Sequence, residues 1–224
     1  MNKILVIVAH ADDEAIGCGG TLLKHRDAGD EIQIIFMTNG VGARENPSIK
    51  EEEIRQTAKE KSCQQIRVMA SHQFDYPDNA MDQVALIEVV KSIENVISNY
   101  HPNIIYTHHG GDLNIDHQIV HQAVLTACRP QPSSSIRKIL TFEVNSSTEW
   151  ASNSIGTNFS PNYYVNISHQ STEKQDLLKH YIDEMHPYPH SRSIQAIINL
   201  NQARGNHIGV AVAEAFMLLR ELVI

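Results

Sequence analysis

The feature that constrains this chain most is an apolar run that leads directly into a histidine and three carboxylates. Residues 4–9 (ILVIVA) are rich in β-branched side chains, which is typical of a strand buried on both faces in a parallel sheet. The residues with titratable side chains that follow at once are His10, Asp12, Asp13 and Glu14. In open α/β folds, ligands bind in the crevice beyond the carboxyl ends of the strands. The run therefore predicts an α/β fold whose ligand crevice receives these side chains.

Three neighbouring carboxylates repel one another and are costly to remove from water. A divalent cation bound among them would offset both effects. Alternatively, the carboxylates start a helix, because negative charges suit the positive end of the helix macrodipole. The two interpretations are compatible, and we expect a metal site at the start of a helix.

Short apolar runs alternate with helical patterns along the chain, which is the signature of βαβ units and a largely parallel sheet. We expect strands at residues 4–9, 31–37, 67–70, 104–107 and 139–144, and helices at 14–28, 49–62, 82–99 and 116–128. The C-terminal third adds an apolar run at 163–167 and helical patterns at 172–185 and 193–203. The prediction is a Rossmann-like α/β fold, with a mostly parallel sheet flanked by helices and the site at the carboxyl ends of its strands. We expect one domain over residues 1–224.

Composition narrows the class of partner. The net charge of -8 argues against non-specific binding to nucleic acid or to an anionic membrane surface. No apolar stretch is long enough to span a membrane, and the apolar N-terminal run is too short for a signal peptide. The three cysteines form no CxxC pair, which indicates a reducing compartment. We therefore expect a cytoplasmic protein with a small-molecule substrate, and leave a homo-oligomer open.

A second stretch, residues 106–122 (YTHHGGDLNIDHQIVHQ), also leaves a strand through a glycine-containing loop and enters a helix. His117 and His121 are four residues apart on that helix, a spacing that can bind zinc but arises easily by chance among 13 histidines. His117 also lies just beyond a strand end, as His10 and Asp13 do. Two histidines and one carboxylate form a known catalytic zinc set, although Fe²⁺ and Co²⁺ suit these ligands too.

Two motifs together resemble the LmbE-like or PIG-L family of zinc-dependent de-N-acetylases. They are AHADDE at residues 9–14, where Ala11 stands in place of the family's usual proline, and DLNIDH at 112–117. Segments at 37–44, 75–79 and 142–150 extend the resemblance over nearly the whole chain. The resemblance implies a single LmbE-like deacetylase domain. It also implies a hydrolase that removes the N-acetyl group from an N-acetylglucosamine-type sugar, either a nucleotide sugar or a glycoside of surface glycan or secondary metabolite biosynthesis.

The resemblance also assigns roles to residues of the two motifs. His10, Asp13 and His117 match the zinc ligands, and Asp12 matches the general base. Zinc would lower the pKa of a bound water to about 7 and polarise the acetyl carbonyl. Asp12 would take the proton of that water and pass it to the departing amine. The alternatives for Asp12 are a helix N-cap or a fourth metal ligand.

Two further residues of the second motif are candidates for the catalytic set. Asn114 stands where some family members have a histidine, so it could donate an amide hydrogen bond to the oxyanion beside the zinc. Its alternative is a turn residue that bonds its own loop. Asp116 would then orient another group.

Four residues are expected to bind substrate, each with an ordinary structural alternative. Glu14 could accept a hydrogen bond from a sugar hydroxyl, or it could be a solvent-exposed carboxylate in the first turn of a helix. Arg44 could clamp a phosphate bidentately or lie on the surface. Asp78 could line the mouth of the site or form a turn, and Arg192 could close over the substrate or form an ion pair at a helix start.

Two other functions remain open from the sequence. A dinucleotide-binding Rossmann module is suggested by Gly17, Gly19 and Gly20 after the first strand, but the preceding carboxylates would oppose a pyrophosphate. A zinc-binding but non-catalytic family member is the other alternative, against which the presence of Asp12 argues.

Overall fold

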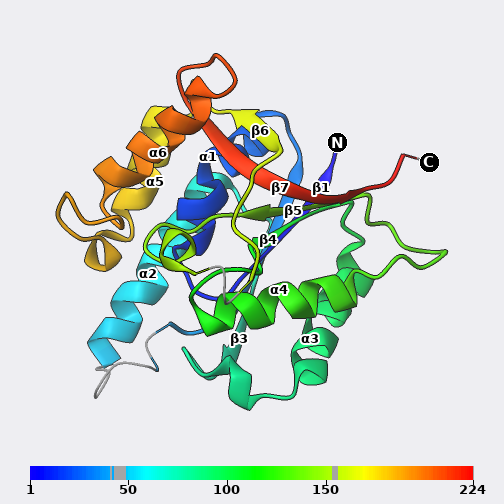
Figure 1. Ribbon diagram of the computed structural model, residues 1–224. Coiled ribbons are helices and arrows are strands. Elements are labelled where there is room, and N and C mark those ends of the chain that lie inside the picture. The colour runs from blue at the N-terminus through cyan, green and yellow to red at the C-terminus, as the bar shows by residue number, and fades with distance from the viewer. Residues whose placement is uncertain (41, 43–48, 153–155, 224) are drawn as a thin grey trace.

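One sheet collects strands from nearly the whole length of the chain. The computed structural model describes residues 1–40, 42, 49–152 and 156–223. Within these residues the strand order is β3-β2-β1-β4-β5-β7-β6 (Figure 1). Strands β3, β2, β1, β4 and β5 are parallel, and β7 runs antiparallel to both β5 and β6. The strands are β1 (Lys3–Val8), β2 (Glu31–Thr38), β3 (Ala70–Tyr76), β4 (Ile104–His108), β5 (Lys138–Phe142), β6 (Tyr163–Asn166) and β7 (Ala213–Glu221). The predicted α/β fold is confirmed.

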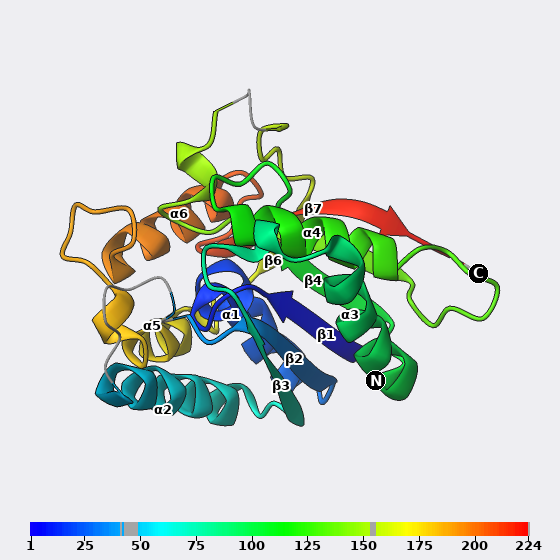
Figure 2. The same cartoon turned by 90° about the horizontal axis from the view of Figure 1, so that it is seen from below.

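Helices cover both faces of the sheet. They are α1 (Asp13–Asp27), α2 (Ile49–Ile66), α3 (Leu86–Tyr100), α4 (Ile115–Ala127), α5 (Ser171–Lys179) and α6 (Ile194–Asn206). Figure 2 shows α3 and α4 on one side of the sheet and α1, α2, α5 and α6 on the other. None of the helices in the described ranges is both long and apolar enough to span a bilayer.

The alternation of side chains along β1 produces these two layers, because successive residues of a strand point to opposite faces. Ile4, Val6 and Val8 belong to the core under α1 and α5. Leu5 and Ile7 belong to the core under α3 and α4. All five are completely buried. The uninterrupted apolar run therefore predicted a strand buried on both faces correctly.

Several predicted boundaries are wrong. The helical pattern at residues 172–185 ends at Lys179, and a separate 3₁₀ turn follows at Ile182–Glu184. The third strand is not at residues 67–70 but spans Ala70–Tyr76, after Arg67 turns the chain with a φ of 61°. It is an edge strand whose residues alternate between half-buried and exposed, so its polar sequence ASHQFDY contains no apolar run. The helix predicted from residue 82 begins instead at Leu86, after a 3₁₀ turn at Met81–Gln83.

β7 was not predicted from the sequence, although residues 215–219 (AFMLL) form an apolar run directly after Glu214. Glu214 is buried, and its carboxylate accepts a hydrogen bond from Lys174 Nζ at 2.6 Å. Both side chains also bind the backbone in the middle of α1. Glu214 accepts from the N–H groups of Gly20 (2.8 Å) and Thr21 (2.7 Å), and Lys174 donates to the carbonyl of Ile16 (2.9 Å). This buried pair joins α1 to α5 and β7.

The glycines after the first strand serve close packing. A Cβ atom on Gly17 would lie 2.1 Å from the ring of Phe142, and one on Gly20 would lie 2.5 Å from Ile167. Both glycines lie inside α1, past its first turn. They let the helix approach its neighbours, whereas a dinucleotide module needs such glycines in the turn before the helix.

Candidate active site

The loop between β1 and α1 is held in a strained conformation. Asp12 is the N-cap of α1 with a φ of 119°, which non-glycine residues rarely adopt. The backbone N–H of His10 donates to Asp13 Oδ2 at 2.9 Å, and that of Asp12 donates to Glu14 Oε2 at 3.0 Å. Strain of this kind persists only where surrounding contacts fix it, and it is common at functional sites.

Glu14 lies inside the protein and does not line the cavity of the site. Its Oε1 accepts hydrogen bonds from Ser62 Oγ and from Tyr181 OH, each at 2.7 Å. Burial raises the pKa of Glu14 above its usual value, although these hydrogen bonds oppose the shift. We expected Glu14 beside the substrate; in the structure its carboxylate shapes the loop that carries Asp12.

Two loops bring the three predicted metal ligands together. Ligand atoms of His10, Asp13 and His117 all lie within 4.8 Å of one another. Asp13 Oδ2 is 3.3 Å from His10 Nδ1 and 3.4 Å from His117 Nε2. His10 follows β1 and His117 lies in the first turn of α4, whose preceding strand β4 pairs with β1. The neighbouring parallel strands thus deliver both loops to one edge of the sheet.

The arrangement of these groups fits a divalent cation. Asp13 Oδ1 and His117 Nε2 are buried, and neither has a hydrogen-bond partner among the described residues. Burial would lower the pKa of His117, but Asp13 and Asp112 raise it to about 9. The same negative field attracts a metal ion. Two imidazoles and one carboxylate match the ligand set of catalytic zinc sites, which leaves a position open for water.

Carboxylates also lie behind both imidazoles. Asp116 Oδ2 is 3.0 Å from His10 Nε2, and Asp112 Oδ1 is 3.2 Å from His117 Nδ1. Asp116 is fixed by the backbone N–H groups of Asn79 (2.7 Å) and Met81 (3.0 Å). In metal sites, such carboxylates fix the tautomer and orientation of the ligand histidine. The geometry gives Asp116 a group to orient, and it gives a similar position to Asp112, a residue of the second motif to which the sequence had assigned no role.

Two other histidines, His108 and His121, lie near the cluster of candidate ligands. His108 Nε2 is 3.5 Å from Asp13 Oδ2, but both histidines also contact the backbone. His108 Nε2 accepts a hydrogen bond from the N–H of Ala9 at 2.9 Å, and its ring stacks on His117 with centroids 3.8 Å apart. His121 Nδ1 is 2.8 Å from the carbonyl oxygen of His108. The spacing of His117 and His121 on one helix therefore does not bring His121 into the ligand cluster.

Two arginines converge on Asp12. Its carboxylate is completely buried, and Oδ2 accepts a hydrogen bond from Arg192 Nη2 at 2.9 Å. Arg55 Nη2 lies 3.9 Å from Oδ1 and donates to the carbonyl of Ala11 at 3.0 Å. Burial raises the pKa of Asp12, and the two arginines oppose that shift. Arg55 had no distinguishing signal in the sequence, because α2 contains many charged residues.

A cavity of about 340 Å³ opens beside this cluster. Its lining residues are His10, Gly40, Arg55, Asp78, Asn79, Asn114, Glu184, His186 and Arg192. Asp78 Oδ1 is 3.1 Å from His10 Nε2. Asn114 is the N-cap of α4: its Oδ1 accepts from the N–H of Asp116 at 2.8 Å, while its Nδ2 donates to Asn79 Oδ1 at 3.0 Å. The predicted residues Asp78, Asn114 and Arg192 thus line the cavity, and Arg44 lies outside the described residues.

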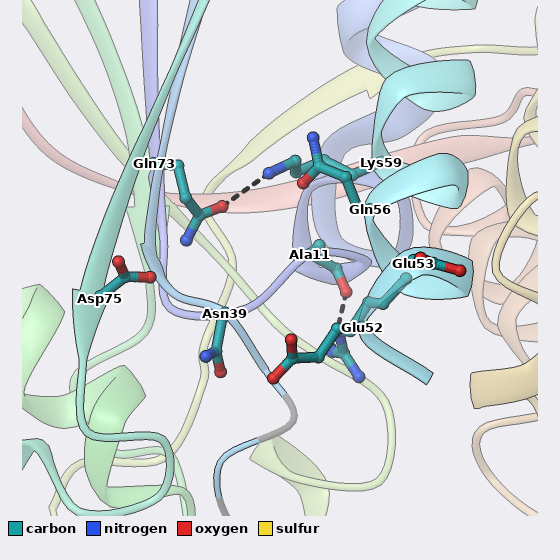
Figure 3. A pocket seen from close by; sticks show the side chains of 9 residues that line it. Ala11, Asn39, Glu52, Glu53, Gln56, Lys59, Gln73 and Asp75 are labelled. Carbon is teal, nitrogen blue, oxygen red and sulfur yellow. Dashed lines mark hydrogen bonds between the residues drawn. The ribbon is translucent and has the colours of Figure 1, made fainter. Parts of the chain in front are cut away.

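A second cavity, of about 500 Å³, lies between α2 and β3 (Figure 3). Arg55 lines both cavities. Lys59 and Gln73 point toward one another across it, with Lys59 Nζ donating to Gln73 Oε1 at 2.7 Å. Glu52 and Asp75 also line it. Most of its lining residues are polar or charged, and none of them is a candidate metal ligand.

The sheet and the residues at its carboxyl edge define an α/β protein with a candidate metal centre next to a buried aspartate. Residues 5–128 match the model of the family PIG-L: GlcNAc-PI de-N-acetylase. The chain therefore belongs to the PIG-L family, which confirms the resemblance drawn from its two motifs, and it is an enzyme of the deacetylase class. An uncharacterized deacetylase, YaiS of Escherichia coli K12, is 31% identical over 134 residues, covering 58% of this chain and 69% of the relative.

Solved structures share the fold over nearly the whole chain. The N,N'-diacetylchitobiose deacetylase from Pyrococcus horikoshii, complexed with an inhibitor, has a TM-score of 0.79 and 21% identity, covering 98% of this chain and 84% of that one. A 4-carboxy-2-hydroxymuconate hydratase, GalB from Pseudomonas putida KT2440, has a TM-score of 0.77 and 16% identity, covering 100% and 98%. The same fold thus carries different reactions, and the function must be argued from the site.

Proposed function

We propose that this chain is a zinc-dependent hydrolase that removes the N-acetyl group from an N-acetylglucosamine-type sugar. The observation that carries the proposal is the cluster of His10, Asp13 and His117 beside the buried carboxylate of Asp12. Family membership supports the same class of reaction. When bound, the ion supplies a Lewis acid for the acetyl carbonyl and lowers the pKa of water towards neutrality.

Asp12 moves the protons of the reaction. Its Oδ2 is held by Arg192, whereas Oδ1 has no hydrogen-bond partner among the described residues. Oδ1 therefore takes the proton of the attacking water. It then returns that proton to the sugar amine, which must be protonated to leave. Arg192 fixes the orientation of the carboxylate and lowers its pKa relative to burial alone.

The other residues of the site orient groups or bind substrate. Asp116 orients His10, and Asp112 orients His117. Asn114 Nδ2 is the amide donor for the oxyanion, for which it must exchange its hydrogen bond to Asn79. Asp78 lines the cavity, where its carboxylate accepts a hydrogen bond from a hydroxyl group of the sugar.

We also propose a cellular setting for the enzyme. Cys18, Cys63 and Cys128 are all free thiols. Their state supports a reducing compartment, and we place the enzyme in the cytoplasm.

An amine-release screen tests the proposal. Zinc-loaded protein is incubated with N-acetylglucosamine, its 1-phosphate, its UDP- and GDP-linked forms and its glycosides, and free amine is quantified. The expected result is amine release that a chelator abolishes and added zinc restores. Stoichiometric zinc without amine release from any acetamido sugar would instead support the non-catalytic alternative, and stoichiometric uptake of NAD would support the dinucleotide module.

A further inference from the structure

Three aromatic rings form a strip that leads out of the cavity. His186 lines the cavity, and its ring centroid is 4.2 Å from that of His190. His190 in turn contacts Trp150, edge to face, with centroids 5.7 Å apart. Trp150 is 52% exposed. We call these three residues the aromatic strip.

Hydrogen bonds fix both segments that carry the aromatic strip. The N–H of Ser146 donates to Ser191 Oγ at 2.8 Å, and the carboxylate of Glu149 accepts from Ser146 and Ser191. Thr148 Oγ1 donates to Asp112 Oδ2 at 2.6 Å, which ties the segment of Trp150 to the carboxylate behind His117. Isolated exposed apolar residues are common on protein surfaces. Trp150 differs from them because its segment is bound both to Asp112, which contacts the candidate ligand His117, and to the segment that holds Arg192.

The charges of the two segments that carry the aromatic strip do not favour a phosphate, and Arg55, which also lines the cavity, is paired with Glu184 at 2.9 Å. Within residues 145–152 and 185–193 the only lysine or arginine is Arg192. Its guanidinium is already paired with Asp12. Glu149 adds a negative charge beside the strip. A diphosphate placed here would therefore find no unpaired lysine or arginine in these two segments, whereas a neutral ring needs none.

We propose that the aromatic strip is a subsite for a neutral pyranose ring attached to the acetamido sugar, which stacks on the indole of Trp150. The C–H bonds on a pyranose face carry a partial positive charge and are attracted to the electron-rich face of an aromatic ring. This inference rests on the proposed function, which places the acetamido group at the metal cluster. It specifies a glycoside in preference to a nucleotide sugar.

A comparison of kcat/KM for two substrates, in the wild type and in variants, tests the subsite. For zinc-loaded Trp150→Ala, kcat/KM for a disaccharide of N-acetylglucosamine should fall roughly three- to tenfold, while kcat/KM for the free monosaccharide stays unchanged. Trp150→Phe should recover most of the difference. Met69→Ala is the matched control, because Met69 is 55% exposed and lies just before the edge strand β3, whereas Trp150 lies in the segment after the interior strand β5. Equal effects of Trp150→Ala on both sugars, or a larger effect on a UDP-linked sugar, would overturn the proposal.

A second measurement does not depend on turnover. Trp150 is the only tryptophan of the chain, so its fluorescence reports directly on the aromatic strip. Titration with the deacetylated disaccharide should shift or quench the emission of the zinc-loaded protein, and glucosamine should not. If no acetamido sugar is hydrolysed but the disaccharide still changes the emission, the proposed function fails and the subsite stands. If both sugars are hydrolysed and the emission stays constant, the subsite alone fails.

Discussion

Arg192 Nη2 donates a hydrogen bond of 2.9 Å to Asp12 Oδ2, although the two residues lie 180 positions apart in the chain. The bond joins the loop after the first strand to the segment before α6 (Ile194–Asn206). It occupies one oxygen of the carboxylate and leaves the other without a hydrogen-bond partner among the described residues. This arrangement supports the role proposed for Asp12, which requires a carboxylate that is fixed in place and has one oxygen free of hydrogen bonds.

The variant Asp12→Asn should still bind the metal, but its kcat should be much lower than that of the wild type. The amide keeps an oxygen that can accept from Arg192, but it cannot take a proton, so kcat should fall by roughly 10²- to 10⁴-fold. The measurement is kcat at saturating substrate together with the zinc content of the same sample. Near-wild-type turnover with full zinc occupancy would contradict the role of Asp12 as general base.

Removal of a predicted ligand should remove the metal. His117→Ala takes one of three donors from the cluster, and most bound zinc and activity should be lost, as measured by elemental analysis after dialysis. His121→Ala is the matched control, since His121 lies one turn further along α4 and binds the carbonyl of His108 instead. If the two variants lose zinc equally, the ligand assignment is wrong.

Asp116→Asn should weaken metal binding without removing a ligand. The amide can present its NH₂ group to His10 Nε2, which favours the wrong tautomer of the imidazole. We expect a roughly 10- to 100-fold loss of zinc affinity, measured by competition with a chromophoric chelator. An unchanged affinity would show that Asp116 serves only to bind the N–H groups of Asn79 and Met81.

Asn114→Ser separates the two roles of this residue. Serine is also a good N-cap, so the hydrogen bond to the N–H of Asp116 can be kept, whereas the amide donor is lost. If Nδ2 stabilises the oxyanion, kcat should fall on the order of 10²- to 10³-fold with zinc retained. A variant with normal kcat and normal thermal stability would leave Asn114 as a helix cap alone.

Lys174→Met should destabilise the fold more than it affects catalysis. The substitution leaves the carboxylate of Glu214 buried without its cation, at a cost of roughly 3–5 kcal/mol in the free energy of unfolding. Chemical denaturation measures this loss. The double variant Lys174→Met with Glu214→Gln should recover part of it, because the amide oxygen can still accept from the N–H groups in α1. If the double variant is no more stable than Lys174→Met, the lost stability results from altered packing and not from the unpaired charge of Glu214.

The central strands and the ligand cluster could be predicted because local patterns specify them. The run at residues 4–9 is apolar on both faces, and the two motifs place His10, Asp13 and His117 just beyond strand ends. The edge strand β3 could not be predicted, because its polar sequence contains no apolar run, whereas β7 was not predicted although residues 215–219 (AFMLL) form one.

The roles of the surrounding residues depend on contacts between distant segments. Glu14 has the same local sequence context as Asp12 and Asp13, but Tyr181 and Ser62 bind it inside the core. Arg55 approaches Asp12 from a helix that contains many other charged residues. Only the assembled fold distinguishes these side chains from their neighbours.

The contact of Lys174 and Glu214 with the middle of α1 limits how the chain can be divided. The region that matches the family model, residues 5–128, contains every candidate metal ligand. Yet the glycine-rich face of α1 inside that region is covered by side chains from much later in the sequence, such as Ile167 and Leu177. A fragment that ends after α4 would expose this face and leave the N–H groups of Gly20 and Thr21 without their carboxylate. We therefore expect that the half of the sequence that matches the family model does not fold on its own, and that a shortened enzyme or a chimera must keep α5 and β7 together with α1.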